Sequence, residues 1–132
     1  MGALRQRTFY LAASFKDIEK ARKYANRVET AKGLACTSSW LRGEDEGDSG
    51  ELALLDIRDI ERADIVLVWL TGTISPGKHI EYGFCLGQGK VTYLLYERRR
   101  RAEPGIIRAK CVFYSLSPMM TWDEFLEGEF GT

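Results

Sequence analysis

The stretch IVLVWL, residues 65–70, is an unbroken apolar run near the middle of the chain. A strand with one solvated face alternates apolar and polar residues, whereas a continuous apolar run is typical of a strand buried on both faces, as in a parallel sheet. A second such run, VTYLLY, occupies residues 91–96. The two runs therefore predict a parallel sheet with helices on both faces.

Segments with helical periodicity alternate with the strand-like runs on either side of this stretch. The alternation predicts an α/β fold, namely a flavodoxin-like (Rossmann-like) three-layer sandwich with a mostly parallel five-stranded sheet. The expected helices cover residues 18–33, 51–62 and 79–88 and begin again at residue 121, and the further strands cover residues 8–13, 34–37 and 112–114.

Composition bounds the class of protein. A length of 132 residues is that of one ordinary domain, and 45% apolar with 29% charged residues is typical of a globular chain. The 19 acidic and 19 basic residues balance, so no overall field favours a nucleic acid polymer or a membrane surface as partner. No stretch approaches the length of a membrane span.

The cysteines and the histidine bear on compartment and metal binding. Three cysteines, widely spaced in apolar runs, indicate buried free thiols in a reducing cytoplasm, where we expect the protein to reside. With no CxxC pair and a single histidine, we expect no metal site.

Ligands of open α/β sheets bind outside the carboxyl ends of the strands, which directs attention to the loops at residues 13–17, 38–46, 71–78 and 97–105. Glu81 follows the third of these loops. In the first turn of the expected helix, the helix dipole would keep its carboxylate ionised, as a nucleophile needs. An ordinary first-turn acid fits the same position.

Asp56 is the second candidate carboxylate, flanked by the apolar Leu55 and Ile57. Asp59 and Asp64 lie near it in the sequence, and periodicity alone does not say which of the three faces the strand ends. A solvated helix acid is an equal reading of Asp56 and the better reading of Asp59.

Small residues before the third helix are typical of an anion site. SPGK, residues 75–78, combines a serine, a glycine and a helix start, where free backbone N–H groups attract phosphate. Ser14 and Lys16 would add a hydroxyl group and a charge, or act as a helix N-cap and a surface lysine. The aromatic residues Tyr10, Trp40 and Trp69 lie near strand ends, where they would stack on a base or pack in the core. The Walker and dinucleotide patterns are absent.

Three stretches together resemble a known family: FYLAAS (residues 9–14), DIRDIERADIVLVWL (56–70) and SPGKHIEYGFCLGQGKV (75–91). In this order and spacing they look like the nucleoside 2-deoxyribosyltransferase superfamily, which includes the 2′-deoxynucleoside 5′-monophosphate N-glycosidases. The resemblance covers roughly residues 8–96. It implies that residues 1–132 form a single domain of this type, with a flavodoxin-like sheet, a homodimeric or higher homo-oligomeric state, and no metal or organic cofactor.

The resemblance also implies roles for individual residues. The family's catalytic glutamate opens the helix after the third strand, which makes Glu81 the nucleophile. The family's aspartate lies eight residues before the Asp that opens the third strand, so Asp56 matches it. Tyr10 matches the tyrosine of the first strand and completes the expected catalytic set.

A second set of positions is expected to bind the substrate and its phosphate. Ser14, Lys16, Ser75 and Gly77 fit the spacing found in the monophosphate hydrolases. Lys78, as part of the SPGK stretch, and Trp40, as an aromatic residue that would stack on a base, are added to this set. Many deoxyribosyltransferases carry Asp where Ser75 stands, so Ser75 favours a 5′-phosphate and hydrolysis. The Ser or Asn that a neighbouring subunit contributes in the family has no counterpart in residues 101–106.

The resemblance thus predicts an enzyme: an N-glycosidase that cleaves the base–sugar bond of a (deoxy)nucleoside 5′-monophosphate through a glutamate nucleophile, or that transfers the deoxyribosyl group. Its partner would be a small-molecule nucleotide or nucleoside. The alternative is a module on the same fold that binds or senses a nucleotide or NAD derivative without turnover. A domain whose site has decayed is the third reading.

Overall fold

The apolar run at residues 65–70 forms the middle strand of the sheet. The computed structural model describes residues 6–43, 48–71, 75–98 and 111–128. Within them the sheet has the order β2-β1-β3-β4-β5, and every pairing is parallel. The strands are β1 (Thr8–Ala12), β2 (Ala35–Cys36), β3 (Ile65–Trp69), β4 (Val91–Tyr96) and β5 (Met119–Thr121). This is the flavodoxin-like order, so the predicted fold class is confirmed.

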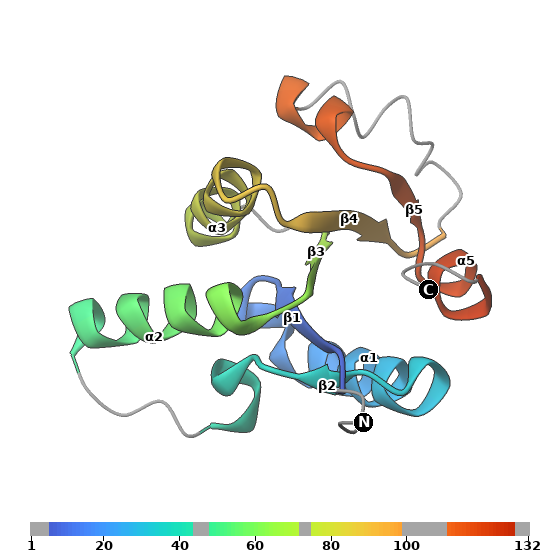
Figure 1. Cartoon of the computed structure of the whole chain (residues 1–132), viewed down its shortest axis with the longest axis horizontal. Coiled ribbons are helices and arrows are strands. Elements are labelled where there is room, and N and C mark those ends of the chain that lie inside the picture. The colour runs from blue at the N-terminus through green and yellow to red at the C-terminus, as the bar shows by residue number, and fades with distance from the viewer. Residues whose placement is uncertain (1–5, 44–47, 72–74, 99–110, 129–132) are drawn as a thin grey trace, which may run out of the picture.

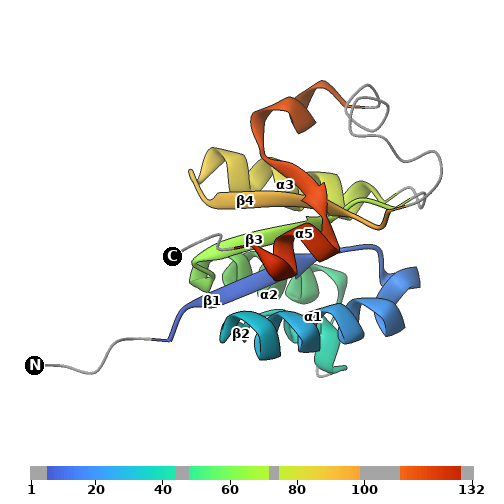
Figure 2. The same cartoon turned by 90° about the vertical axis from the view of Figure 1, so that its right-hand side faces the viewer.

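Helices cover both faces of the sheet (Figure 1). The longer ones are α1 (Ile18–Lys32), α2 (Ser49–Arg62), α3 (Pro76–Gly87) and α5 (Trp122–Glu127). Figure 2 shows α1 and α5 on the near face, with α2 and α3 behind the strands. Because helices lie on both sides, all five residues of β3 are buried, as the continuous apolar run predicts.

Local signals explain where several helices begin and end. Helix α1 stops at Gly33, whose left-handed φ of 66° lets its N–H reach the carbonyl of Glu29. Helix α5 starts with a capping box, in which Thr121 Oγ1 accepts from the N–H of Glu124 and the Glu124 carboxylate accepts from the N–H of Thr121. No helix in the described part of the chain is long and apolar enough to cross a membrane.

The face covered by α1 and α5 holds an aromatic cluster. Trp69 lies edge-on to Tyr24 and Trp122, with ring centroids 5.2 and 6.1 Å away. The Tyr24 ring stacks on Trp122 at 4.1 Å. Trp69 is therefore a core residue, which settles one of the two readings that its sequence position left open.

The expected strand at residues 112–114 is wrong. These residues belong to a 3₁₀ helix, η3 (Val112–Leu116), and the fifth strand is Met119–Thr121. Val112 and Phe113 are 76% and 59% exposed. Strand preference of such residues reflects packing on a half-buried pleated surface, and these two side chains have no such surface.

Two other boundaries differ from the expectation. The expected loop at residues 38–46 includes the 3₁₀ helix η2 (Ser39–Arg42), in which Trp40 and Leu41 are buried. Helix α3 begins at Pro76 rather than at residue 79, because Ser75 caps it and proline suits the first helical position. The expected loop at residues 97–105 lies largely outside the described residues.

Candidate functional site

Tyr10 and Glu81, 71 positions apart in the sequence, meet at the face of the sheet covered by α2 and α3. Tyr10 is the third residue of β1 and is fully buried. Its phenol donates a hydrogen bond of 2.5 Å to Oε2 of Glu81, which is half-buried on α3. The fold therefore brings together two of the three residues expected to be catalytic.

The third, Asp56 on α2, acts on both of them through its charge. Burial raises the pKa of Glu81 to about 7, while the hydrogen bond from Tyr10 opposes this rise and the charges of Asp56 and Asp59 add to it. Burial and the Glu81 and Asp56 carboxylates also raise the pKa of Tyr10 well above its usual value. Tyr10 consequently stays protonated near neutral pH and can donate to Glu81.

The expectation that the helix dipole keeps the Glu81 carboxylate ionised is wrong. Because α3 begins at Pro76, Glu81 is its sixth residue and lies beyond the first turn. The helix dipole acts mainly within that turn, so it does not hold the carboxylate ionised. Burial dominates instead and favours the protonated form.

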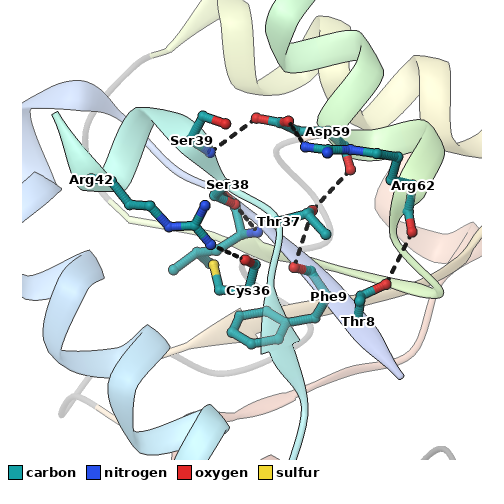
Figure 3. Close-up of polar contacts among 10 residues, drawn as sticks. Thr8, Phe9, Cys36, Thr37, Ser38, Ser39, Arg42, Asp59 and Arg62 are labelled. Carbon is teal, nitrogen blue, oxygen red and sulfur yellow. Dashed lines mark hydrogen bonds and ion pairs between the residues drawn. The ribbon is translucent and has the colours of Figure 1, made fainter. Parts of the chain in front are cut away.

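Asp59 is wholly buried, in contrast to the solvated acid expected from the sequence. Its Oδ2 accepts from the backbone N–H of Ser39 at 2.9 Å, and its Oδ1 accepts from Nη2 of Arg62 at 2.5 Å (Figure 3). Asp59 lies three residues after Asp56 and so on the same side of α2. The three-residue spacing of Asp56 and Asp59 in the sequence predicts that both side chains lie on the same side of the helix.

The start of α3 contains three of the predicted phosphate-binding residues. Ser75 caps the helix, with its Oγ accepting from the N–H of Lys78 at 3.3 Å. Gly77 is exposed, and a Cβ atom there would meet no atom within 4 Å. Ser75 and Gly77 thus lie at a helix N-terminus of the kind that binds anions.

Lys78 differs from its neighbours in this turn. It is only 3% exposed, and its Nζ donates to the carbonyl of Trp69 at 3.1 Å, at the end of β3. Burial lowers its pKa, and the charge of Asp17 partly restores it. The ammonium group is therefore enclosed beneath the carboxyl edge of the sheet rather than displayed to solvent.

The loop after β1 meets the loop after β3 at this edge. Thr71 Oγ1 donates to Oδ2 of Asp17 at 3.2 Å. Ser14 is the N-cap residue of the 3₁₀ helix η1 (Phe15–Asp17), as one of its two readings expects, but it is 6% exposed and its side chain makes no cap hydrogen bond. Lys16 is exposed, as expected for either of its readings. The contact of Asp17 with Thr71 was not predicted from the sequence.

Trp40 packs over the end of β1. Its side chain is buried, and its Nε1 donates to the carbonyl of Leu11 at 3.0 Å. Ser38, which sequence reasoning also missed, is fully buried and accepts from the N–H of Leu11 at 2.7 Å. Both residues fix the strand end beside Tyr10.

Within the described ranges, no group of three or more His, Cys, Asp or Glu side chains is arranged to hold a metal ion. Cys85, one turn after Glu81, is buried, and burial together with the Glu81 charge raises its pKa to about 12. Its thiol is consequently protonated near neutral pH and is no candidate nucleophile.

Comparisons with known proteins establish the class of the fold. No protein-family model matches the chain, and no curated protein matches its sequence. Among solved structures, the chain is similar to the CMP N-glycosidase BcmB of Clostridium botulinum, with a TM-score of 0.61 and 23% sequence identity. The match covers 92% of this chain and 96% of that one. At this identity the likeness shows a shared α/β fold.

Proposed function

We propose that the protein is an N-glycosidase that cleaves the base–sugar bond of a (deoxy)nucleoside 5′-monophosphate, with Glu81 as nucleophile. The observation that carries the proposal is the hydrogen bond between the buried Tyr10 and Glu81, formed beside the second carboxylate Asp56. Two neighbouring carboxyl groups are what retaining glycoside cleavage requires. The fold shared with a CMP N-glycosidase supports the same reaction class.

In the proposed first step, the ionised Glu81 carboxylate attacks C1′ of the sugar and forms an ester bond to it. The glycosidic C1′–N bond breaks, and its electron pair leaves with the base, which takes up a proton from Asp56 or from solvent. Asp56 assists this departure or holds the sugar. Water then attacks C1′, releases the sugar phosphate and returns Glu81 as a carboxylate, with the water proton passing to solvent or Asp56.

Tyr10 orients the nucleophile in this scheme. Its hydroxyl donates to one oxygen of Glu81 and leaves the other oxygen for C1′. Because the hydrogen bond favours the charged form, it opposes the rise in pKa that burial causes. The same contact therefore fixes the direction of the carboxylate and increases its ionised fraction at neutral pH.

We place the 5′-phosphate at the start of α3, with Ser75, Gly77 and the loop residues Ser14 and Lys16 around it. A helix N-terminus and two hydroxyl groups suit a dianion. Lys78 would contribute its charge from below, and Trp40 would bound the pocket at the end of β1. A homodimer, and transfer of the deoxyribosyl group to a second base, are further parts of this proposal that rest on the family resemblance.

The test is the release of free base, followed by chromatography. The wild-type protein is incubated with CMP, the four dNMPs, cytidine, deoxynucleosides and NAD. Glu81→Gln is expected to lower the rate of base release by at least about 10³-fold, because the nucleophile is lost. Glu61→Gln, a matched change at an exposed glutamate on α2, is expected to keep the wild-type rate.

Each outcome decides between the candidate functions. Activity of Glu81→Gln within tenfold of wild type would exclude Glu81 as nucleophile. Binding of a nucleotide without release of base would favour the sensing module. Appearance of a new nucleoside when a second base is added would identify transfer.

A further inference from the structure

His79 is the one histidine in the sequence, and it has no part in the reaction steps above. It lies in the first turn of α3, and its side chain is exposed. Nevertheless both of its ring nitrogens contact protein groups: Nδ1 lies 3.1 Å from the carbonyl oxygen of Ser75, and Nε2 lies 2.7 Å from the hydroxyl oxygen of Tyr114. The ring therefore joins the residue that caps α3 to η3.

The two partners of His79 decide where its ring hydrogen lies. A carbonyl oxygen only accepts, so Nδ1 must carry the hydrogen that faces Ser75. In a neutral ring Nε2 is then an acceptor, and the Tyr114 hydroxyl donates to it. Burial raises the pKa of Tyr114, so this hydroxyl keeps the hydrogen that it donates. The contacts thus assign the Nδ1–H tautomer and form one directed chain from Tyr114 to Ser75.

The Tyr114 end of this chain is anchored in the protein. Tyr114 is only 7% exposed, and its ring lies nearly parallel to that of His79, with centroids 5.8 Å apart. The 3₁₀ helix η3 is itself joined to α3, because the hydroxyl of Tyr82 donates to the carbonyl of Phe113 at 2.8 Å. The Tyr114 hydroxyl therefore approaches His79 from an element that is attached to the same helix.

The Ser75 end lies in the turn where we place the 5′-phosphate. The Ser75 carbonyl accepts from Nδ1 of His79 and, at 3.4 Å, from the backbone N–H of His79. Its Oγ accepts from the N–H of Lys78, and a hydroxyl that accepts in this way still has its own hydrogen to donate to an anion. Because the imidazole holds the Ser75 carbonyl, it also holds the direction in which that hydroxyl points.

We propose that His79 is a positioning residue: locked by Tyr114 in the Nδ1–H tautomer, it holds Ser75 in the orientation that receives the phosphate group of the nucleotide. Neither His79 nor Tyr114 touches the reacting atoms in the proposed scheme. The consequence for phosphate binding rests on the proposed function, whereas the tautomer of His79 does not.

The tautomer is measured by long-range ¹H–¹⁵N NMR on untagged, ¹⁵N-labelled protein at about pH 8.5, above the range in which imidazoles ordinarily take up a proton. Because the chain has one histidine, every imidazole signal belongs to His79. We expect a protonated Nδ1 and an unprotonated Nε2. An Nε2–H ring, or a ring that averages both tautomers, would overturn the proposal.

The effect on phosphate binding is measured by calorimetry in the Glu81→Gln background, which prevents turnover. The tightest-binding of CMP and the four dNMPs is compared with its matching nucleoside. Tyr114→Phe and His79→Ala should each weaken binding of the monophosphate by about three- to tenfold, through loss of one or two hydrogen bonds, and leave binding of the nucleoside unchanged. His79→Asn, whose amide can donate to the Ser75 carbonyl as Nδ1–H does, should weaken it less than His79→Ala.

Tyr82→Phe is the matched control, because it removes a hydroxyl that joins α3 to η3 and leaves the contact between His79 and Tyr114. It should keep the affinity for the monophosphate. Equal losses for monophosphate and nucleoside, or a loss in Tyr82→Phe as large as in Tyr114→Phe, would show general loosening and overturn the proposal, as would a background protein that binds no monophosphate. Absence of base release by the wild type would refute the proposed function alone, since neither measurement needs turnover.

Discussion

Tyr10→Phe removes a single oxygen atom, the one that donates to Glu81. The phenyl ring fills nearly the same space, so the principal loss is the hydrogen bond to the charged carboxylate. Such a bond contributes about 1.5–3 kcal/mol. Because 1.36 kcal/mol corresponds to one pKa unit, its loss should raise the pKa of Glu81 from about 7 by roughly one to two units.

The expected effect on activity follows from this shift. A nucleophile must be ionised, so kcat/KM should rise with pH through the pKa of Glu81 in the free enzyme. In wild type the midpoint of this acid limb should lie near pH 7. In Tyr10→Phe the ionised fraction at pH 7 falls from about one half to between about a tenth and a hundredth, and activity should largely return near pH 9.

The assay is the pH profile of base release from CMP or a dNMP between pH 5 and 9.5. Tyr24→Phe is the matched control, because the Tyr24 hydroxyl also donates to a glutamate, Glu97, at 3.0 Å on the opposite face of the sheet. That variant should keep the wild-type midpoint. A Tyr10→Phe midpoint that stays in place or moves to lower pH would refute the reasoning.

Two further predictions concern stability and the phosphate. The pKa of Glu81 in the folded protein, about 7, lies above the usual 4.5, so the stability of the wild type falls as pH rises from 4.5 to 7. In urea unfolding, Glu81→Gln should therefore be more stable than wild type by up to about 3 kcal/mol at pH 8 and nearly equal to it at pH 4.5. A stability difference that does not depend on pH would contradict the burial assigned to Glu81. Ser14→Ala should lower kcat/KM for a nucleoside monophosphate by about tenfold or more, through loss of a hydrogen bond to a charged group, while turnover of the matching nucleoside stays the same. Equal losses for both substrates would remove Ser14 from the phosphate site.

The central strands could be predicted because their apolar runs admit few other structures. Residues 65–70 and 91–96 are too apolar for a surface and too short for most helices, and both form parallel strands. The fifth strand could not be located, since its three residues are too few to show a period. The more strand-like residues 112–114 lie nearby and form a 3₁₀ helix.

The sequence predicted that Tyr10 and Glu81 share a site, but it did not predict the burial and hydrogen bonding that set their electrostatics. The family resemblance selected Tyr10, Asp56 and Glu81, and the fold brings the first and last into contact. The start of α3 was misjudged, although a serine followed by proline is a helix-start signal. Burial of Asp59 depends on contacts with Ser39 and Arg62, one of which is 20 positions away, and no local pattern encodes such a contact.

The strand order has a consequence for how the site is assembled during folding. Strand β1 needs β3 as its neighbour, and residues that bond across these strands, such as Thr8 and Asp64, are 56 positions apart. Pairings of this range are slow to form, because the entropy of closing a long loop is lost before the contacts are gained. Tyr10 can meet Glu81 only after the chain has passed through β3 and α3. Recovery of the Tyr10–Glu81 contact would therefore report late tertiary assembly, whereas far-ultraviolet circular dichroism would report the earlier helices.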